Sequence, residues 1–148
     1  MNVDTDKLIS IIVPVYNAEA YVEKTIKMVQ AQTYPYWELI MVDDHSSDSS
    51  KDKITHVLDM GGNCEEIYLI AKKNNEGAAK ARNDGLAAAK GRYIAYLDAD
   101  DIWMPDKLEK EMVFLQEKEA AFVFSAYEFG DASGKGTGKV VTVPETLN

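Results

Sequence analysis

The sequence predicts an α/β protein in which helices cover both faces of a mainly parallel sheet, giving a three-layer α/β/α sandwich. Five short runs of almost continuously apolar residues occur along the 148-residue chain. Strands that are buried on both faces of a parallel sheet have this character. Four segments with helical periodicity separate the apolar runs, and this alternation with short connections is typical of right-handed βαβ units.

The predicted strands are identified by their apolar runs. They cover residues 8–15, 37–42, 67–71, 93–97 and 122–127. The first predicted helix extends from about residue 18 to about residue 32, and it places Val22, Ile26 and Val29 on one face.

Three further helices are predicted from apolar or small residues that recur at helical spacing. These residues are Ile54, Val57 and Leu58 for the second helix, Ala78, Ala81, Gly85 and Ala89 for the third, and Leu108, Met112 and Leu115 for the fourth. The second helix follows residues 46–48, which offer N-capping side chains. Gly91 is a candidate C-cap for the third helix, and Pro105 is a favourable first residue for the fourth.

The length of the chain suggests a single domain over residues 1–148, with its core at about residues 8–127. Residues 128–148 are predicted to form a flexible tail. Within this tail, residues 130–138 hold four of the nine glycines and no large apolar residue, which is typical of a loop. The sequence also allows one late strand in this tail, at residues 140–143.

The composition excludes several classes of protein. The formal net charge of −9 repels phosphate backbones, so non-specific binding of nucleic acid is not expected. The single cysteine, Cys64, allows no disulfide within the chain and no zinc cluster, which fits a reducing compartment. The polar N-terminus does not resemble a signal peptide, and no apolar run approaches the ~20 residues of a membrane span. A cytoplasmic protein without a transmembrane segment is therefore expected.

Polar clusters follow four of the predicted strands. They are residues 16–17, 43–45, 74–77 and 98–101. Open parallel sheets bind ligands beyond the carboxyl ends of their strands. The topology is therefore expected to bring these four segments to one rim of the sheet.

An acidic cluster with Asp98, Asp100 and Asp101 follows the fourth strand. Three carboxylates within four residues repel one another unless a cation or solvent separates them. Hard oxygen ligands suit Mg²⁺ or Mn²⁺, which can also bridge a substrate diphosphate. On its own such a cluster is more often a solvated turn ahead of a helix, but its position directly after a buried strand favours a metal site. A calcium EF-hand is excluded because Ile102 and Trp103 do not continue its loop.

Four other residues each have two interpretations. Asp43 and Asp44 either turn the chain and cap the next helix, or accept hydrogen bonds from a base N–H or a ribose hydroxyl. Tyr16 either packs against the protein or stacks on a base. Arg82, near the N-terminal end of the predicted third helix, either approaches a diphosphate or pairs with a nearby acid.

Four ordered motifs resemble those of the family 2 glycosyltransferases of the GT-A fold. The motifs are residues 10–17, 32–48, 75–83 and 91–101, the last followed by residues 104–108. The similarity extends from about residue 8 to about residue 127, and four motifs in order are far more specific than an isolated D-x-D motif. His45 departs from the glycine that is commoner at its position, which alters a turn.

The resemblance implies roles for nine residues and Mg²⁺ or Mn²⁺ as the cofactor. Pro14, Val15 and Tyr16 would line a base pocket, and Asp44 would hydrogen-bond the base, with Asp43 nearby. Arg82 would help to bind the diphosphate. Asp100 would be the direct metal ligand, Asp98 would contact the ribose or a metal-bound water and is a second candidate ligand, and Ala99 would lie between these two aspartates in the donor site.

The implied activity is transfer of a sugar from a nucleoside-diphosphate sugar, a UDP-sugar first among them, to an acceptor hydroxyl with inversion of configuration. The acceptor would be a glycan or a lipid-linked molecule in bacterial-type polysaccharide or cell-surface glycan synthesis, with the full-length enzyme free to lie peripherally on the inner face of the membrane. No catalytic residue is assigned, because the family's carboxylate base lies beyond the matching region. We therefore expect the donor-binding part of a longer catalytic domain, or a lone donor-binding module, which by itself transfers little or no sugar.

Two other classes of protein are considered. A phospho-accepting receiver module also has paired aspartates and a Mg²⁺ site, but its pair follows the first strand, whereas Asp43 and Asp44 follow the second. A sugar nucleotidyltransferase would need a glycine-rich phosphate loop after the first strand, and residues 14–17 do not supply it.

Overall fold

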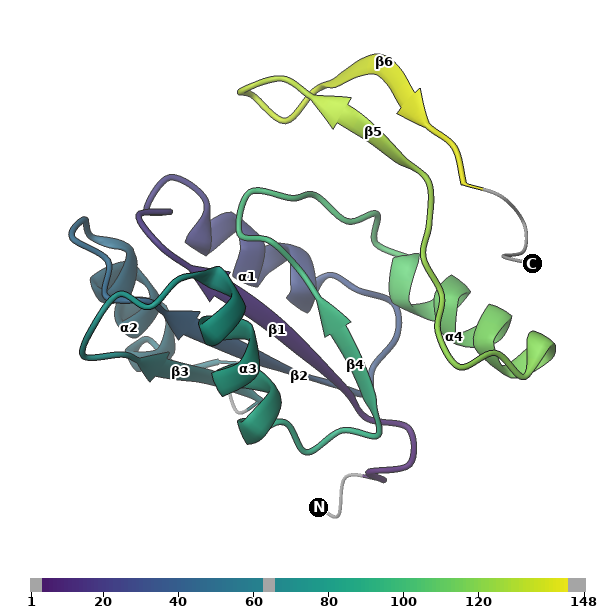
Figure 1. Ribbon diagram of the computed structural model, residues 1–148, viewed down its shortest axis with the longest axis horizontal. Helices are drawn as coiled ribbons and strands as arrows, with labels where there is room; N and C mark the ends of the chain where they lie inside the picture. The colour runs from purple at the N-terminus through teal and green to yellow at the C-terminus, as the bar shows by residue number, and fades with distance from the viewer. Residues whose placement is uncertain (1–3, 63–65, 144–148) are drawn as a thin grey trace. The chain divides into compact units, whose positions relative to one another are not determined.

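The computed structural model describes residues 4–62 and 66–143 (Figure 1). Cys64 lies outside these residues. The elements in chain order are β1 (Ile9–Val15), α1 (Val22–Gln30), β2 (Trp37–Asp43), α2 (Ser50–Asp59), β3 (Ile67–Ala71), α3 (Ala78–Ala88), β4 (Tyr93–Tyr96), α4 (Lys107–Lys118), β5 (Tyr127–Gly130) and β6 (Gly136–Val141). The chain divides into two compact units, Met1–Pro105 and Asp106–Asn148. Among the described residues, no helix is long and apolar enough to cross a membrane.

The first unit is built on a four-stranded parallel sheet with the strand order β3-β2-β1-β4. β1, β2 and β3 end level with one another, since Val15 pairs with Asp43 and Asp43 pairs with Ala71. β2 is buried along its whole length, and β1 is almost entirely buried. The near-continuous apolar runs of β1 and β2 reflect this burial on both faces, whereas the edge strands β3 and β4 are only partly buried. The predicted parallel α/β architecture is confirmed.

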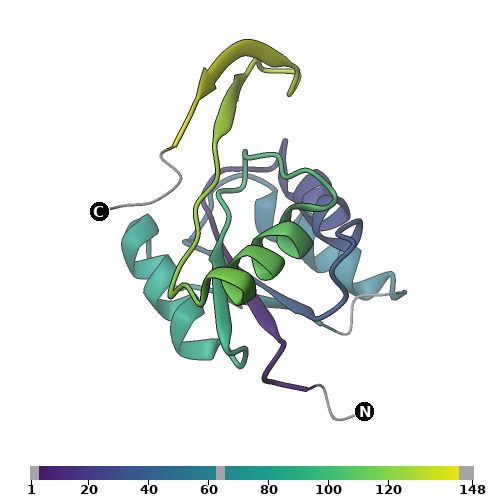
Figure 2. The same cartoon turned by 90° about the vertical axis from the view of Figure 1, so that its right-hand side faces the viewer.

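Helices cover both faces of this sheet. α3 lies on one face, against β1 and β2, whereas α1 and α2 lie together on the other face (Figures 1 and 2). A Cβ atom added to Gly85 of α3 would lie 2.5 Å from Cγ2 of Ile12 and 3.2 Å from Cγ2 of Val42. The small-residue face predicted for this helix therefore allows its backbone to approach the sheet closely.

A buried polar network lies at the end of the sheet where the strands begin. Glu38 is buried, and its Oε1 accepts hydrogen bonds from the Ser10 hydroxyl (2.5 Å) and the Lys90 amide (2.7 Å). The Gly91 amide in turn donates to Ser10 Oγ over 2.8 Å. These bonds satisfy a buried carboxylate and link β1 and β2 to the connection between α3 and β4.

Three helix ends differ from the predicted positions. α2 has Ser49 as its N-cap, one residue beyond the predicted capping segment, and α4 begins after Asp106 instead of at Pro105. α3 has Ala89 as its C-cap, so Gly91 does not end this helix. Gly91 is needed for a different reason, because an added Cβ would lie 2.6 Å from the Leu8 carbonyl oxygen.

The second unit contains α4 and an antiparallel hairpin of β5 and β6. The Oδ1 atom of Asp131 closes the hairpin turn by accepting hydrogen bonds from the amides of Ser133 (2.8 Å) and Lys135 (3.1 Å). The glycine-rich residues 130–138 therefore form the end of β5, the turn and the start of β6, and the flexibility predicted for residues 128–148 stays a prediction. The predicted late strand at residues 140–143 corresponds to the end of β6.

The prediction of a fifth parallel strand at residues 122–127 is wrong. Within the described residues, residues 122–126 form no strand, and Tyr127 begins β5 of the hairpin. The apolar run contains Phe122 and Phe124, whose rings stack with their centroids 6.1 Å apart and which are exposed. An apolar run alone does not distinguish a strand of the sheet from such an aromatic pair, because the run does not show whether its side chains pack against the sheet.

Candidate functional site

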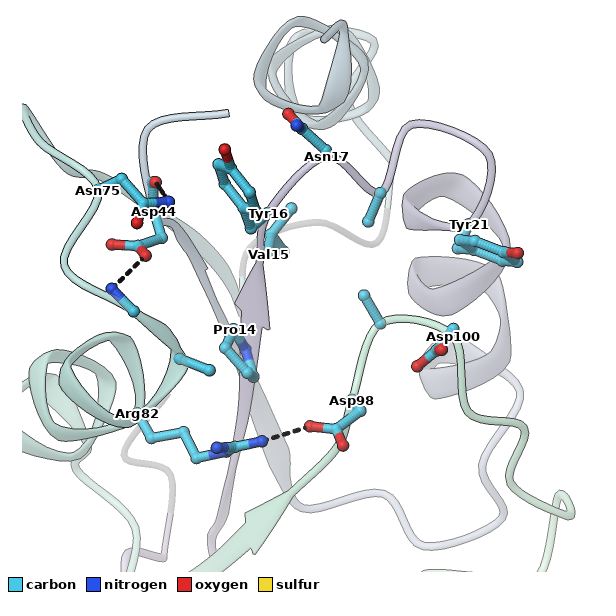
Figure 3. Close-up of a pocket in the computed structure, with 14 residues that line it drawn as sticks. Pro14, Val15, Tyr16, Asn17, Tyr21, Asp44, Asn75, Arg82, Asp98 and Asp100 are labelled. Carbon is cyan, nitrogen blue, oxygen red and sulfur yellow. Dashed lines mark hydrogen bonds and ion pairs between the residues drawn. The ribbon is translucent and has the colours of Figure 1, made fainter. Parts of the chain in front are cut away.

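A cavity of about 450 Å³ lies in the first unit, where β1, β2 and β4 end and α3 begins (Figure 3). Its lining residues are Pro14, Val15, Tyr16, Asn17, Ala18, Tyr21, Asp44, Asn75, Gly77, Ala78, Arg82, Asp98, Ala99 and Asp100. Eight of the nine predicted site residues therefore line this one cavity. The ninth, Asp43, does not line the cavity; it is buried, and its Oδ2 accepts a hydrogen bond from the Ser46 amide over 3.2 Å.

The Asp44 side chain is held from several directions. Its Oδ1 accepts a hydrogen bond from the Glu76 amide (3.0 Å) and its Oδ2 accepts one from the Gly77 amide (2.7 Å). The Lys72 ammonium lies 2.8 Å from Oδ1. Burial by itself raises the pKa of Asp44, but the Lys72 ammonium and the two amides outweigh it and hold the pKa below its usual value. Asp44 is therefore ionised at neutral pH.

Asn17 joins the connection after β1 to the connection after β2. Its backbone has a φ of 48°, in the left-handed region. In this conformation its Oδ1 accepts hydrogen bonds from the amides of Ser47 (2.8 Å) and Asp48 (3.3 Å), and its own amide donates to Ser46 Oγ over 3.0 Å. These bonds fix the backbone directly after Tyr16, whose ring is half exposed at the cavity.

Arg82 and Asp98 face each other in the cavity wall (Figure 3). Nη2 of Arg82, on α3, donates to Oδ1 of Asp98, after β4, over 2.7 Å. Both side chains remain partly exposed, so solvent screens the pair. A guanidinium in this position can also bind the oxygens of an anionic ligand.

The acidic loop of residues 98–101 is tied to α1. The Thr25 hydroxyl donates to the Ala99 carbonyl oxygen over 2.8 Å, and the Asp101 amide donates to the Asp98 carbonyl oxygen over 3.0 Å. Burial, followed by the negative charges of Asp98 and Asp100, raises the pKa of Asp101. Crowded carboxylates of this kind provide a negative potential that attracts a cation.

The side chains of this loop fit a divalent metal ion that shares its shell with a ligand. Within residues 4–62 and 66–143, no group of three or more His, Cys, Asp or Glu side chains is arranged to enclose a metal ion. Asp98 and Asp100 both line the cavity and offer hard oxygen ligands. Mg²⁺ and Mn²⁺ suit such a partial set, because water and phosphate oxygens complete their coordination.

Sequence reasoning assigned no role to several residues that the structure brings to the site. Tyr21, Ala18 and Ala78 line the cavity, and Asn75 both lines it and donates from Nδ2 to the Asp44 carbonyl oxygen over 3.1 Å. Lys72 lies behind Asp44. The only signal in the sequence that could have identified it is its position directly after β3, at the rim that carries the other polar clusters.

The parallel sheet, the cavity at its strand ends and the acidic loop after β4 define a glycosyltransferase domain of the GT-A class. The chain matches the family described as Glycosyl transferase family 2 over residues 10–141, and it belongs to this family. Membership sets aside the receiver module and the sugar nucleotidyltransferase that the sequence left as alternatives.

Relatives and solved structures agree with this assignment. The chain is 41% identical over 140 residues to TuaG of Bacillus subtilis, a glycosyltransferase assigned to teichuronic acid biosynthesis, covering 95% of this chain and 54% of the relative. It is 42% identical over 123 residues to WfgD of Escherichia coli, a UDP-Glc:alpha-D-GlcNAc-diphosphoundecaprenol beta-1,3-glucosyltransferase, covering 83% and 47%. The chain therefore spans about half the length of these relatives.

A solved structure with a similar fold contains a nucleotide sugar and a metal ion. It is the mannosyltransferase PcManGT from Pyrobaculum calidifontis in complex with GDP-Man and Mn²⁺, with a TM-score of 0.68 and 25% identity, covering 84% of this chain and 37% of that chain.

Proposed function

We propose that this chain is the donor-binding part of a glycosyltransferase that binds a nucleoside-diphosphate sugar together with a divalent metal ion. The observation that carries the proposal is a single cavity lined by the ionised Asp44, by Arg82 and by the acidic pair Asp98 and Asp100. A base, a diphosphate and a metal ion need these three kinds of partner. A UDP-sugar is the first candidate donor, since WfgD uses UDP-Glc.

The base pocket lies around Tyr16. Its half-exposed ring offers a stacking surface, and Pro14 and Val15 provide an apolar wall. The Asp44 carboxylate accepts a hydrogen bond from a base N–H. Because the amides of Glu76 and Gly77 fix its direction, this acceptor is preorganised before the base arrives.

Arg82 would bind the diphosphate, and Asp98 and Asp100 would hold the metal ion, with Ala99 in the wall between these two aspartates. When bound, Mg²⁺ or Mn²⁺ stabilises the negative charge of the departing nucleoside diphosphate. Arg82 adds a second positive charge beside Asp98, and this arrangement would orient the leaving group.

The reaction of the full-length enzyme is in-line attack of an acceptor hydroxyl on the anomeric carbon, with inversion of configuration. A carboxylate base takes the hydroxyl proton. We place this base in the part of the relatives' length that this chain does not span. The acceptor is a glycan or a lipid-linked molecule in bacterial polysaccharide or cell-surface glycan synthesis. The lipid-linked acceptor of WfgD supports a cytoplasmic enzyme lying peripherally on the inner face of the membrane.

Calorimetry with UDP, GDP and dTDP, each with and without Mn²⁺, tests the proposal. We expect metal-dependent binding of at least one nucleoside diphosphate. Asp100→Ala removes a proposed ligand and should weaken metal-dependent binding by about tenfold or more. Asp59→Ala, an exposed aspartate on α2, is the matched control. Tight binding that ignores both Mn²⁺ and Asp100→Ala would overturn the site assignment.

A further inference from the structure

Lys72 is a buried cation just behind the cavity wall. It follows β3, and its side chain is only 6% exposed. The Nζ atom lies 2.8 Å from Asp44 Oδ1, 2.9 Å from Glu76 Oε2 and 3.5 Å from Asp84 Oδ2. These carboxylates come from the end of β2, the connection before α3 and α3 itself. An ammonium group is tolerated at such a position only when it is paired, so these carboxylates and Lys72 depend on one another.

Of the three carboxylates, Asp44 is the one most dependent on Lys72. Its side chain is 3% exposed, whereas Glu76 and Asp84 reach solvent more freely. Asp84 also pairs with the ammonium of Lys80, which is half exposed. No ion pair within the described residues joins Asp44 to a cation other than Lys72.

The electrostatic balance around the pair favours both charged forms. Burial by itself lowers the pKa of Lys72, but hydrogen bonds to the carboxylates of Asp44 and Glu76 outweigh it and raise the pKa above its usual value. Glu76 and Asp84, which share the Lys72 ammonium with Asp44, are also acidic, so their charges would repel that of Asp44 if Lys72 were removed. Burial would then favour the protonated form of Asp44.

We propose that Lys72 is a positioning residue for recognition of the nucleobase, which keeps the Asp44 carboxylate ionised and aimed into the cavity. Lys72 does not line the cavity itself, so it acts through Asp44. The inference rests on the proposed function in one respect, namely that Asp44 accepts a hydrogen bond from a base N–H.

The first experiment needs no nucleotide. The Asp44 carboxyl is titrated by carbon-13 NMR in wild type, Lys72→Met, Lys72→Arg and Lys80→Met. We expect Lys72→Met to move the Asp44 titration to higher pH, and the other two variants to leave it close to the wild-type position. Lys80→Met is the matched control, because it removes a lysine from Asp84 without touching Asp44. An unchanged titration in Lys72→Met would overturn the inference, whether or not the protein binds a nucleotide.

The second experiment measures UDP affinity in the presence of Mn²⁺ from about pH 8 to about pH 5.5. Each variant is compared with wild type at the same pH, which cancels the titration of UDP itself. Lys72→Met should weaken binding by about tenfold at the upper end of this range and by more as the pH falls, because a protonated Asp44 presents a poorer acceptor. Lys72→Arg keeps the positive charge, so the ratio of its UDP affinity to that of wild type should be the same at every pH. A loss in Lys72→Met that is the same at every pH would overturn the inference.

A double variant separates positioning from folding. In an Asp44→Asn background the buried negative charge is absent, so Lys72→Met should fold, as circular dichroism will show, and should not weaken UDP binding further. An additional loss in this background would show that Lys72 acts independently of Asp44. If wild type binds no nucleoside diphosphate, the proposed function fails, and the NMR titration still decides the role of Lys72.

Discussion

The guanidinium group of Arg82 donates a hydrogen bond to the carboxylate of Asp98 over 2.7 Å, and it thereby joins α3 to the acidic loop after β4. Asp98 is at the same time a proposed partner of the metal ion or the ribose. In the ligand-free protein a positive side chain therefore balances part of the charge that a metal ion is proposed to neutralise. We expect the proposed donor to exchange this intramolecular pair for contacts with its diphosphate and with the metal ion.

Arg82→Ala should weaken binding of UDP but not binding of uridine. Loss of a charge-assisted hydrogen bond to the diphosphate should lower the affinity for UDP by about tenfold or more. Uridine has no diphosphate, so its affinity should not change. Calorimetry in the presence of Mn²⁺ measures both affinities. Arg92→Ala, which removes an exposed arginine paired with Asp6 outside the cavity, is the control. Equal losses for uridine and UDP would argue against a diphosphate contact.

Asp44 should make folding stability depend on pH in the acidic range. Its pKa is lowered in the folded protein, so its stabilising contribution is complete above the pKa of the unfolded chain, about 4, and is lost as the pH falls through the folded value. Urea unfolding between about pH 6 and about pH 3 should therefore show a shallower loss of stability for Asp44→Asn than for wild type. Asp59→Asn serves as the control. Parallel curves for Asp44→Asn and wild type would contradict the prediction.

Glu38→Ala should destabilise the fold without affecting the site. The variant leaves the Ser10 hydroxyl and the Lys90 amide without their buried acceptor, at a cost of about 2–3 kcal/mol in the free energy of unfolding. Glu38→Gln keeps an oxygen acceptor and should cost less. Urea unfolding at neutral pH gives the two values, and UDP affinity at a temperature where both variants are folded should match wild type. A clear drop in affinity would show that the two ends of the sheet are coupled.

His45→Val should be less stable than His45→Gly. His45 has a φ of 61°, a left-handed conformation that disfavours β-branched residues by about 1–2 kcal/mol, whereas glycine adopts it freely. Thermal unfolding of wild type and the two variants measures the order of stability. Asn17 has a φ of 48°, so a lower stability of Asn17→Val than of Asn17→Gly would support the explanation. Equal stabilities of His45→Val and His45→Gly would show that the turn relaxes to another conformation.

The four strands of the parallel sheet and its small-residue helix could be predicted because each is encoded locally. Periodicity and continuous apolar runs identify elements, and the rule for parallel sheets identifies the rim. The same local signals could not show that residues 122–127 lie outside the parallel sheet. Residues 122–127 have the same apolar character as the true strands, and only the pairing of Tyr127 with Val141 shows where the segment belongs.

The predicted site residues differ in how far the sequence could place them. Asp43 and Asp44 are adjacent, yet only Asp44 reaches the cavity, because successive side chains at the end of a strand point in different directions. The role of Lys72 depends on carboxylates at positions 44, 76 and 84, which no local pattern connects. Asn17 likewise bonds to amides about thirty residues away, and its left-handed backbone has no clear sequence signal.

The level ends of β1, β2 and β3 have a consequence for engineering this domain. The connections that follow the level strands β1 and β2 meet at the cavity with Arg82 of α3 and the acidic loop after β4, so the residues proposed to contact the base, the diphosphate and the metal ion lie on separate segments. Substitutions at Tyr16 can therefore be screened for a changed base preference without altering Arg82 or the acidic loop. The proposed assignments therefore predict that substrate choice in this architecture can be varied one segment at a time.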